Sequence, residues 1–330
     1  MLCFNQRLVV LGVIVICAHY LTQSSSQTQL RVGFYSRTCP QAESIVRSVV
    51  QAAVASDPTM AAVLLRLHFH DCFVEGCDGS ILIDNGANAE KNAFGHQGVR
   101  GFDVIEAAKS RLESVCRGVV SCADIVALAA RDAISLSRGP SYAVPTGRRD
   151  GRVSDLSLAA NMPDVRDSIQ LLRSKFRRMG LSDRDLVLLS AAHSIGTTAC
   201  FFMTHRLYNF TGRGDADPAI SRNFLPKLKA TCPNGGDVNV RLPLDPMTGQ
   251  VLDDQILRNI RAGFAVIESD ARLYDDRSTR QLVDFYSGFR NSQFGSPFGS
   301  DFARSMVKMG QIGVKTGFKG EIRQVCRSFN

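Results

Sequence analysis

Beyond its N-terminal stretch, this 330-residue chain lacks any apolar run long enough to cross a membrane. The apolar run 8–18 follows Arg7 and falls short of the roughly 20 apolar residues that a membrane-spanning helix needs. A short apolar run between a basic residue and small polar residues is typical of a signal peptide. We therefore predict that residues 1–28 are removed, with cleavage near Gln27 to Gln29. Residues 29–330 are then expected to form a single secreted domain.

The sequence also lacks runs of Lys and Arg, and it has no basic segment interleaved with aromatic residues. Both features are typical of nucleic-acid-binding proteins, so their absence argues against a nucleic-acid partner. The formal net charge is nevertheless +8. A basic secreted protein can bind acidic polysaccharide, but a solvated basic surface without a partner explains the charge equally well.

No two cysteines have the C-x-x-C spacing, which argues against a zinc site. Of the ten cysteines, Cys3 and Cys17 fall in the predicted signal peptide, which leaves eight. An even number in a secreted chain favours disulfides, four in this case. Spacing alone supports only the local pair Cys72–Cys77, because eight cysteines allow 105 pairings.

Apolar residues recur at helical spacing through most of the chain, and strand-like runs are few and short. Ser121 with Asp124, and Ser182 with Asp185, resemble capping boxes that start helices. The sequence therefore predicts an all-α fold, as one compact unit or two lobes. The predicted helices are 41–56, 59–73, 102–115, 121–136, 168–179, 186–194, 221–229, 254–268, 279–291 and 300–309.

One segment, residues 66–80, combines two kinds of chemistry. Arg66 and His70 are spaced i and i+4 on a predicted helix, which puts a fixed cation and a titratable base on one face. The following loop is rich in oxygen atoms that suit a hard cation such as calcium. Its oxygen-bearing side chains are Asp71, Asp78 and Ser80, with Gly76 and Gly79 for tight turns.

A second histidine, His193, follows small residues near the end of a predicted helix. A lone histidine of this kind is often a core residue, but it can also ligate a metal. Asp270, after the predicted helix 254–268, could accept its other ring N–H, as carboxylates do for metal-bound histidines. A further oxygen-rich cluster suits either calcium or ordinary turns. It consists of Ser194, Asp245, Thr248 and Asp253.

Five sequence blocks, in order, resemble the secreted plant haem peroxidases of the class III, horseradish-peroxidase family. They are R-L-H-F-H-D-C-F-V-E-G-C-D-G-S at 66–80, R-G-F at 100–102, S-C-A-D-I at 121–125, V-P-T-G-R-R-D at 144–150 and S-A-A-H-S-I-G at 190–196. The likeness extends from Phe34 to Cys326. It implies about ten helices in two lobes around one haem b, and a monomer that does not bind membranes.

The resemblance also implies a role for individual residues. His193 would be the proximal haem ligand, with Asp270 accepting its other N–H. His70 would be the distal acid–base, Arg66 its electrostatic partner, and Phe69 would shield the haem face. Hydrogen peroxide would oxidise small phenolic donors by one-electron steps. The carbonyl of Pro163 would receive the donor.

Two calcium ions, four disulfides and one glycosylation site are also implied by the family. The first calcium would be held by Asp71, Val74, Gly76, Asp78 and Ser80. The second would be held by Ser194, Asp245, Thr248, Val251 and Asp253. The disulfides would be Cys39–Cys116, Cys72–Cys77, Cys122–Cys326 and Cys200–Cys232. Asn209 begins the one N-x-S/T sequon that would carry a glycan.

The chain departs from the family pattern in three places. It has no tryptophan, and Tyr142 stands where relatives often carry one. His96 stands where the family has an Asn that accepts a hydrogen bond from the distal histidine. His96 either takes over that role in the haem pocket or points into solvent while another group, such as a carbonyl, serves His70. The chain continues only four residues past Cys326, without the vacuolar tail of some relatives, which favours the cell wall. Two other functions remain open, a catalytically weak calcium-binding protein of the same fold and a binder of wall polysaccharide.

Overall fold

The computed structural model describes residues 30–288 and 297–330. These residues are mostly helices and loops, with one two-stranded sheet, which confirms the predicted all-α class. The predicted signal peptide, and the end of the predicted helix 279–291, lie outside the described residues. Within the described part of the chain, no helix is both long and apolar enough to cross a membrane.

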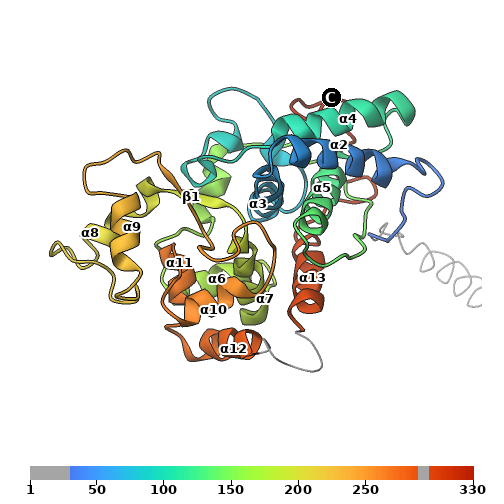
Figure 1. The fold of residues 1–330 in the computed structure, drawn as a ribbon. Helices are drawn as coiled ribbons and strands as arrows, with labels where there is room; N and C mark the ends of the chain where they lie inside the picture. Colours follow the sequence, from blue (N-terminus) through green and yellow to red (C-terminus); the bar gives the residue numbers. More distant parts are fainter. Residues whose placement is uncertain (1–29, 289–296) are drawn as a thin grey trace, which may run out of the picture.

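The helices form two groups that share one core (Figure 1). The first group is α2 (Ala42–Ser56), α3 (Met60–Cys72), α4 (Phe102–Val115) and α5 (Cys122–Leu136). The second is α6 (Ile169–Arg178), α7 (Asp183–Ser190), α10 (Gln255–Arg261), α11 (Glu268–Arg272) and α12 (Arg277–Ser287). Helix α13 (Phe298–Met309) packs against α7 and lies below α5 in the view of Figure 1.

A smaller apolar cluster lies beside these groups. It holds together α8 (Thr204–Tyr208), α9 (Leu225–Thr231) and the antiparallel strands β1 (Thr197–Ala199) and β2 (Arg241–Pro243). Short 3₁₀ turns complete the fold. They are η1 (Ser80–Leu82), η2 (Glu90–Asn92), η3 (Phe94–His96), η4 (Leu156–Asn161), η5 (Ala191–Ser194) and η6 (Cys200–Phe202).

Local capping decides where two central helices begin. The Ser121 hydroxyl accepts a hydrogen bond from the backbone N–H of Asp124 at 3.1 Å, at the start of the almost wholly buried α5. At α7, Ser182 and Asp185 form the complete capping box. The predicted helix 186–194 therefore begins three residues earlier. It ends as an α-helix at Ser190, and η5 follows.

Two further predicted helices were wrong in extent. The predicted helix 254–268 is two helices, because α10 ends at Arg261 and Gly263 has a φ of 77°. The backbone N–H of Phe264 turns back to the Asn259 carbonyl at 2.7 Å, which caps α10 and ends it. Asp270 consequently lies inside a separate short helix, α11. Helix α9 begins at Leu225, four residues after the predicted start at Ser221, because residues 221–224 form turns.

The C-terminal segment folds back under the loop that follows α3. The buried Arg323 side chain donates hydrogen bonds from Nη2 to the carbonyls of Asp78 and Gly79, at 3.2 and 2.9 Å. The backbone N–H of Cys77 donates to the Ile312 carbonyl at 2.9 Å. Four disulfides hold the chain in the pairings that the resemblance implied: Cys39–Cys116, Cys72–Cys77, Cys122–Cys326 and Cys200–Cys232.

Candidate active site

Helix α3 carries Arg66 and His70 one turn apart. The Arg66 guanidinium donates from Nη2 to the Gln97 carbonyl at 3.1 Å. Among the described residues no carboxylate forms an ion pair with it. Burial, followed by the charge of Arg241, lowers the pKa of Arg66 to about 10, so Arg66 is still a cation at neutral pH. Burial, followed by the charges of Arg66 and His96, lowers the pKa of His70 well below its usual range. His70 is therefore neutral and available as a base.

Two buried side chains, those of His96 and Glu90, lead away from His70. Its Nδ1 lies 2.7 Å from Nδ1 of His96, a hydrogen bond in which one nitrogen donates and the other accepts. Nε2 of His96 lies 3.6 Å from Oε1 of Glu90. Burial, with a contribution from Arg66, lowers the pKa of His96 to about 4. Burial chiefly raises the pKa of Glu90 to about 8. The loop with η2 and η3 therefore supplies His70 with a partner.

The second histidine sits at the end of α7, in η5. Nδ1 of His193 lies 2.9 and 3.1 Å from the two carboxylate oxygens of Asp270, which is buried. Burial lowers the pKa of His193, but the charge and hydrogen bond of Asp270 outweigh it and raise the pKa overall. The His193 side chain is 38% exposed, and its Nε2 bonds to no other described residue. This nitrogen is free to ligate a metal.

The two histidines belong to one site. The charge of Arg66 lowers the pKa of both His70 and His193, so the guanidinium lies near both rings. A Cβ atom added to Gly196, three residues after His193, would lie 2.9 Å from Cβ of Ala62, one turn before Arg66 on α3. The segment that follows η5 therefore packs on α3. We call the region bounded by Arg66, His70 and His193 the central space.

The loop after α3 contains buried oxygen atoms that no described group satisfies. Neither carboxylate oxygen of Asp71 has a hydrogen-bond partner, and the Ser80 hydroxyl has none either. Burial, followed by the charges of Asp78 and Glu90, raises the pKa of Asp71 well above its usual range. A bound cation would remove this cost, because buried carboxylates are stable when they are paired or coordinate a metal.

The same loop depends on Gly76. Its φ is 100°, and an added Cβ atom would lie 2.6 Å from Cα of Gly313. Only glycine fits a positive φ and so close an approach of backbone. One oxygen of Asp78 accepts from the Ser80 N–H at 3.0 Å and the other pairs with Lys315. Val74, whose carbonyl the resemblance assigned to the ion, lies two residues before Gly76 in the same loop.

The second oxygen cluster also comes together. The Thr248 hydroxyl lies 3.2 Å from carboxylate oxygens of both Asp245 and Asp253. The Asp253 backbone N–H donates to the Ser194 hydroxyl at 3.3 Å. Unlike Asp71, these carboxylates already accept hydrogen bonds from protein groups, such as Asn259 to Asp245 at 2.8 Å. Val251 belongs to the same turn, in which its N–H donates to the Thr248 carbonyl at 2.8 Å.

Comparison with known proteins identifies this arrangement. A family model described as peroxidase matches residues 46–288, well over half of the chain. The chain belongs to the peroxidase family.

Similar plant proteins agree over nearly the whole length. The chain is 65% identical over 305 residues to Peroxidase 43 of Arabidopsis thaliana, covering 92% of this chain and 94% of the relative. It is 59% identical over 308 residues to Peroxidase 13 of the same plant, with 92% and 94% covered. It is 52% identical over 300 residues to Peroxidase N1 of Nicotiana tabacum, with 91% and 90% covered. The protein is thus a plant haem peroxidase, an oxidoreductase that uses haem and hydrogen peroxide.

The residues of the central space fit a haem group. A histidine with one nitrogen held by a carboxylate and the other unpartnered is a suitable axial ligand for iron. The small side chains of Ala191 and Ala192 precede it in η5. The fit therefore depends on the ring nitrogens of His193 and the carboxylate of Asp270 in this peroxidase, and not only on its likeness to relatives.

The other predicted site residues lie in different surroundings. Phe69 stacks on Phe73, with ring centroids 4.2 Å apart, and its edge meets His70. Cβ of Met162, the residue before Pro163, lies 3.6 Å from the position that a Cβ atom on Gly95 would take. Pro163 is therefore near the turn η3, which contains His96. Asn209 is exposed at the end of α8, where a glycan could be attached. Tyr142 is partly buried and packs against the large apolar core.

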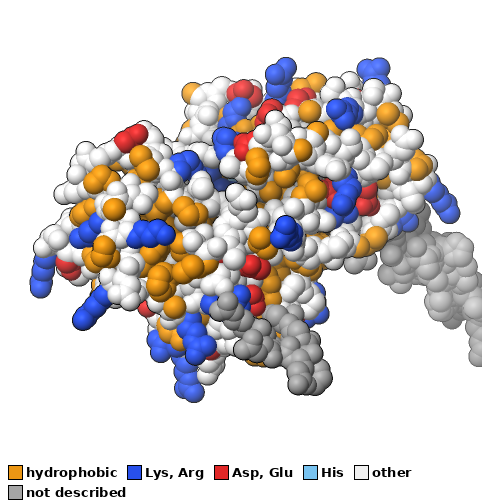
Figure 2. All heavy atoms as spheres, in the orientation of Figure 1, with side chains coloured by type: hydrophobic (Ala, Val, Ile, Leu, Met, Phe, Trp, Pro, Cys, Tyr) orange, Lys and Arg blue, Asp and Glu red, His pale blue; other side chains and the backbone are white. Residues whose placement is uncertain are grey.

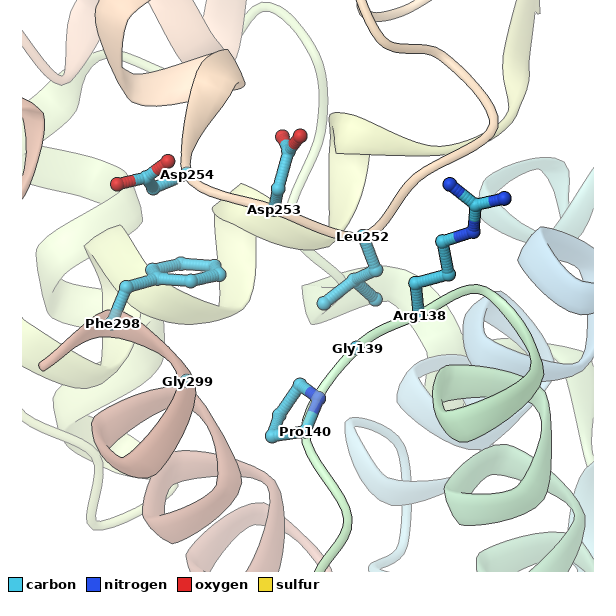
Figure 3. Close-up of a pocket in the computed structure, with 8 residues that line it drawn as sticks. All are labelled: Arg138, Gly139, Pro140, Leu252, Asp253, Asp254, Phe298 and Gly299. Atoms are coloured by element: carbon cyan, nitrogen blue, oxygen red, sulfur yellow. The ribbon is translucent and has the colours of Figure 1, made fainter. Parts of the chain in front are cut away.

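An open pocket of about 260 Å³ lies away from these histidines, where α5 ends and α10 and α13 begin (Figure 3). In Figure 3 the rings of Phe298 and Pro140 and the side chain of Leu252 face its middle, while the carboxylate of Asp253 points away. None of the residues of the central space lines this pocket, so it is not the site of peroxide chemistry.

Two residues near the central space were missed by sequence reasoning. Glu90 lies outside the five sequence blocks, and only the fold buries it beside His96. Arg241 is a single arginine in a loop-like stretch, and only its pairing on β2 brings it towards Arg66. No periodic pattern marks either residue.

Proposed function

We propose that this peroxidase uses hydrogen peroxide to oxidise small phenolic donors in the plant cell wall. The overall reaction converts two phenols and one peroxide into two phenoxyl radicals and two waters. One haem b would be held through Nε2 of His193. The observation that carries the proposal is the pairing of His193 with Asp270, together with Arg66 and His70 one turn apart on α3 and the charge of Arg66 close to His193.

When bound, the haem supplies iron that takes two oxidising equivalents from peroxide and passes them on one at a time. The neutral Nε2 of His70 is suited to take the proton from the near oxygen of peroxide and return it to the far oxygen. The cationic Arg66 stabilises the negative charge that gathers on the departing oxygen. Asp270 accepts a hydrogen bond from the Nδ1–H group of His193, which makes the other ring nitrogen of His193 a stronger electron donor.

We also propose two calcium ions for this protein, one in the loop after α3 and one in the cluster around Asp245. The unsatisfied oxygens of Asp71 and Ser80 support the first site more strongly than the second. Secretion to the wall is supported by four disulfides, which persist in oxidising compartments, and by the exposed sequon at Asn209.

Wall polysaccharide is a candidate partner because of the net charge of +8. Figure 2 shows Lys and Arg side chains spread in separate groups over the visible face, without one dominant patch. Such a distribution fits weak, salt-sensitive attraction of a monomer to a polyanion better than one defined binding site.

The haem assignment is tested with His193→Ala. We expect the purified variant to contain little haem and to lack the strong visible absorption band of the wild type. The matched control is His205→Ala, because His205 is a partly exposed histidine that approaches Glu268, 3.8 Å away, outside the central space. It should retain the wild-type haem content. Normal haem content in the His193 variant would overturn the assignment.

A further inference from the structure

Arg66 and Arg241 lie near each other, and neither has a carboxylate among the described residues to balance its charge. Arg66 donates to a backbone carbonyl, and Arg241 donates from Nε to the Thr197 hydroxyl at 2.8 Å and from Nη2 to the Thr197 carbonyl at 3.0 Å. In the described ranges, 30–288 and 297–330, neither forms an ion pair. Most of the described buried or half-buried arginines other than Arg66 do, as Arg148 does with Asp124 at 2.7 Å, whereas Arg241 is exposed.

The backbone fixes where Arg241 stands. Strand β2 pairs with β1 so that Arg241 is opposite Ala199, and β1 begins four residues after His193. The residue before β1 is Gly196, which packs closely on Ala62 of α3. Because Ala62 and Arg66 are one turn apart on α3, the segment that leads into the β1–β2 sheet lies along the same helix face as Arg66. Arg241 therefore stands at the solvent-exposed side of the central space.

The electrostatics agree with this placement. Together with burial, the charge of Arg241 lowers the pKa of Arg66. Two hydrogen bonds to Thr197 hold the Arg241 guanidinium in one orientation, and they use only two of its five N–H groups. A held guanidinium with free donors suits a carboxylate, which can accept two parallel hydrogen bonds from it.

We propose that Arg241 binds a carboxylate at the exposed side of the central space. This inference rests on the proposed function. This carboxylate has two possible sources. One is a phenolic donor that carries a carboxylate, such as a hydroxycinnamic acid, and the other is a propionate group of the haem. In the first case Arg241 sets donor specificity and favours phenolic acids over neutral phenols. In the second it helps to hold the cofactor.

The experiment compares 4-hydroxycinnamic acid with its methyl ester, which carry the same phenol and differ in the carboxylate. Dissociation constants for the haem-loaded resting protein are measured by spectral titration, and kcat/KM by steady-state turnover. The variants are Arg241→Gln, Arg241→Lys and the control Arg222→Gln. Arg222 is an exposed arginine in the turns before α9. The rate of haem transfer to an excess of apomyoglobin is measured for each protein.

If the carboxylate comes from the donor, Arg241→Gln weakens binding of the acid roughly five- to tenfold and leaves the ester unchanged, since the site is exposed and the pair partly screened. Arg241→Lys then keeps part of the affinity, because it keeps the charge but not the planar fork. If the carboxylate is a propionate, Arg241→Gln speeds haem transfer and affects both donors equally. The Arg222 control behaves as wild type.

Unchanged affinity for the acid together with unchanged haem transfer would overturn the inference. That result is distinct from failure of the proposed function, which would appear as a wild-type protein that does not turn over the ester with peroxide.

Discussion

Replacing His96 with Asn tests how the distal histidine is kept basic. For Nε2 of His70 to accept a proton, Nδ1 of His70 must be the protonated nitrogen. This N–H group then donates a hydrogen bond to Nδ1 of His96, 2.7 Å away. Nδ1 of His96 can accept only when the His96 ring is neutral and its own proton is on Nε2, facing Glu90. An Asn carbonyl at this position would accept without any such condition. We therefore expect His96→Asn to speed the first reaction with peroxide.

The size of the effect depends on pH and follows from the burial of His96. An ordinary histidine, with a pKa of about 6.5, would lose its acceptor below about pH 6. Burial lowers the pKa of His96 to about 4, which moves the loss into more acidic solution. At pH 4 about half of the His96 rings are protonated, so the variant should be roughly twofold faster than wild type from this cause. At pH 3 the ratio should approach roughly tenfold.

A second contribution does not depend on the charge of His96. If Glu90 is protonated, as its raised pKa favours, it no longer favours a proton on Nε2 of His96, 3.6 Å away, and the His96 proton can move to Nδ1. His70 then carries its proton on the nitrogen that should be the base. Loss of a general base costs roughly 10²-fold or more in rate, so even a partial reversal is measurable.

The assay is stopped-flow absorbance of the first reaction with peroxide from pH 3 to 8, for wild type and His96→Asn. Glu90→Gln is added in both backgrounds to form a double-mutant cycle. Glu90→Gln should slow the wild type more than the Asn variant, since it acts through the His96 ring. Superimposable pH profiles for wild type and His96→Asn would refute the reasoning and mean that His96 does not control His70.

Two further predictions concern stability. Chelating calcium should lower the thermal midpoint. The calcium-free protein should be more stable near pH 5 than near pH 8, because buried Asp71 and Glu90 have raised pKa values and their charging opposes folding as pH rises. A calcium-free midpoint that rises with pH would contradict this. Arg138→Gly should stabilise the fold by about 0.5–1 kcal/mol in denaturant unfolding, because Arg138 has a φ of 63° at the end of α5, where glycine is favoured. A lower stability would contradict this.

Features set by nearby residues could be predicted from the sequence. The starts of α5 and α7 follow from Ser121 and Ser182, whose hydroxyls act on the next turn of the same chain. The spacing of Arg66 and His70 likewise places both on α3. The apolar pattern failed at Gly263, because Phe264 and the residues after it continue the apolar composition past the true end of α10.

Features set by distant residues could not be predicted from the residues alone. The contact of His193 with Asp270 joins residues 77 apart, and that of His70 with His96 joins residues 26 apart. The first was expected from the family resemblance and the second was left open, while Glu90 and Arg241 were not noticed. Strands of three residues, such as β1 and β2, bury too few side chains to leave an alternating pattern.

The folded-back C-terminal segment has a consequence for biosynthesis. The loop that carries Asp71 and Asp78 is supported by the Ile312 carbonyl and by Arg323, and the next turn by a hydrogen bond from the Asp84 N–H to the Arg327 carbonyl at 2.8 Å. During translation this loop emerges more than 230 residues before Arg323. It cannot reach its final form until residues 312–327 have left the ribosome. Messages truncated in their last codons should therefore yield chains with intact helices and a misformed loop after α3.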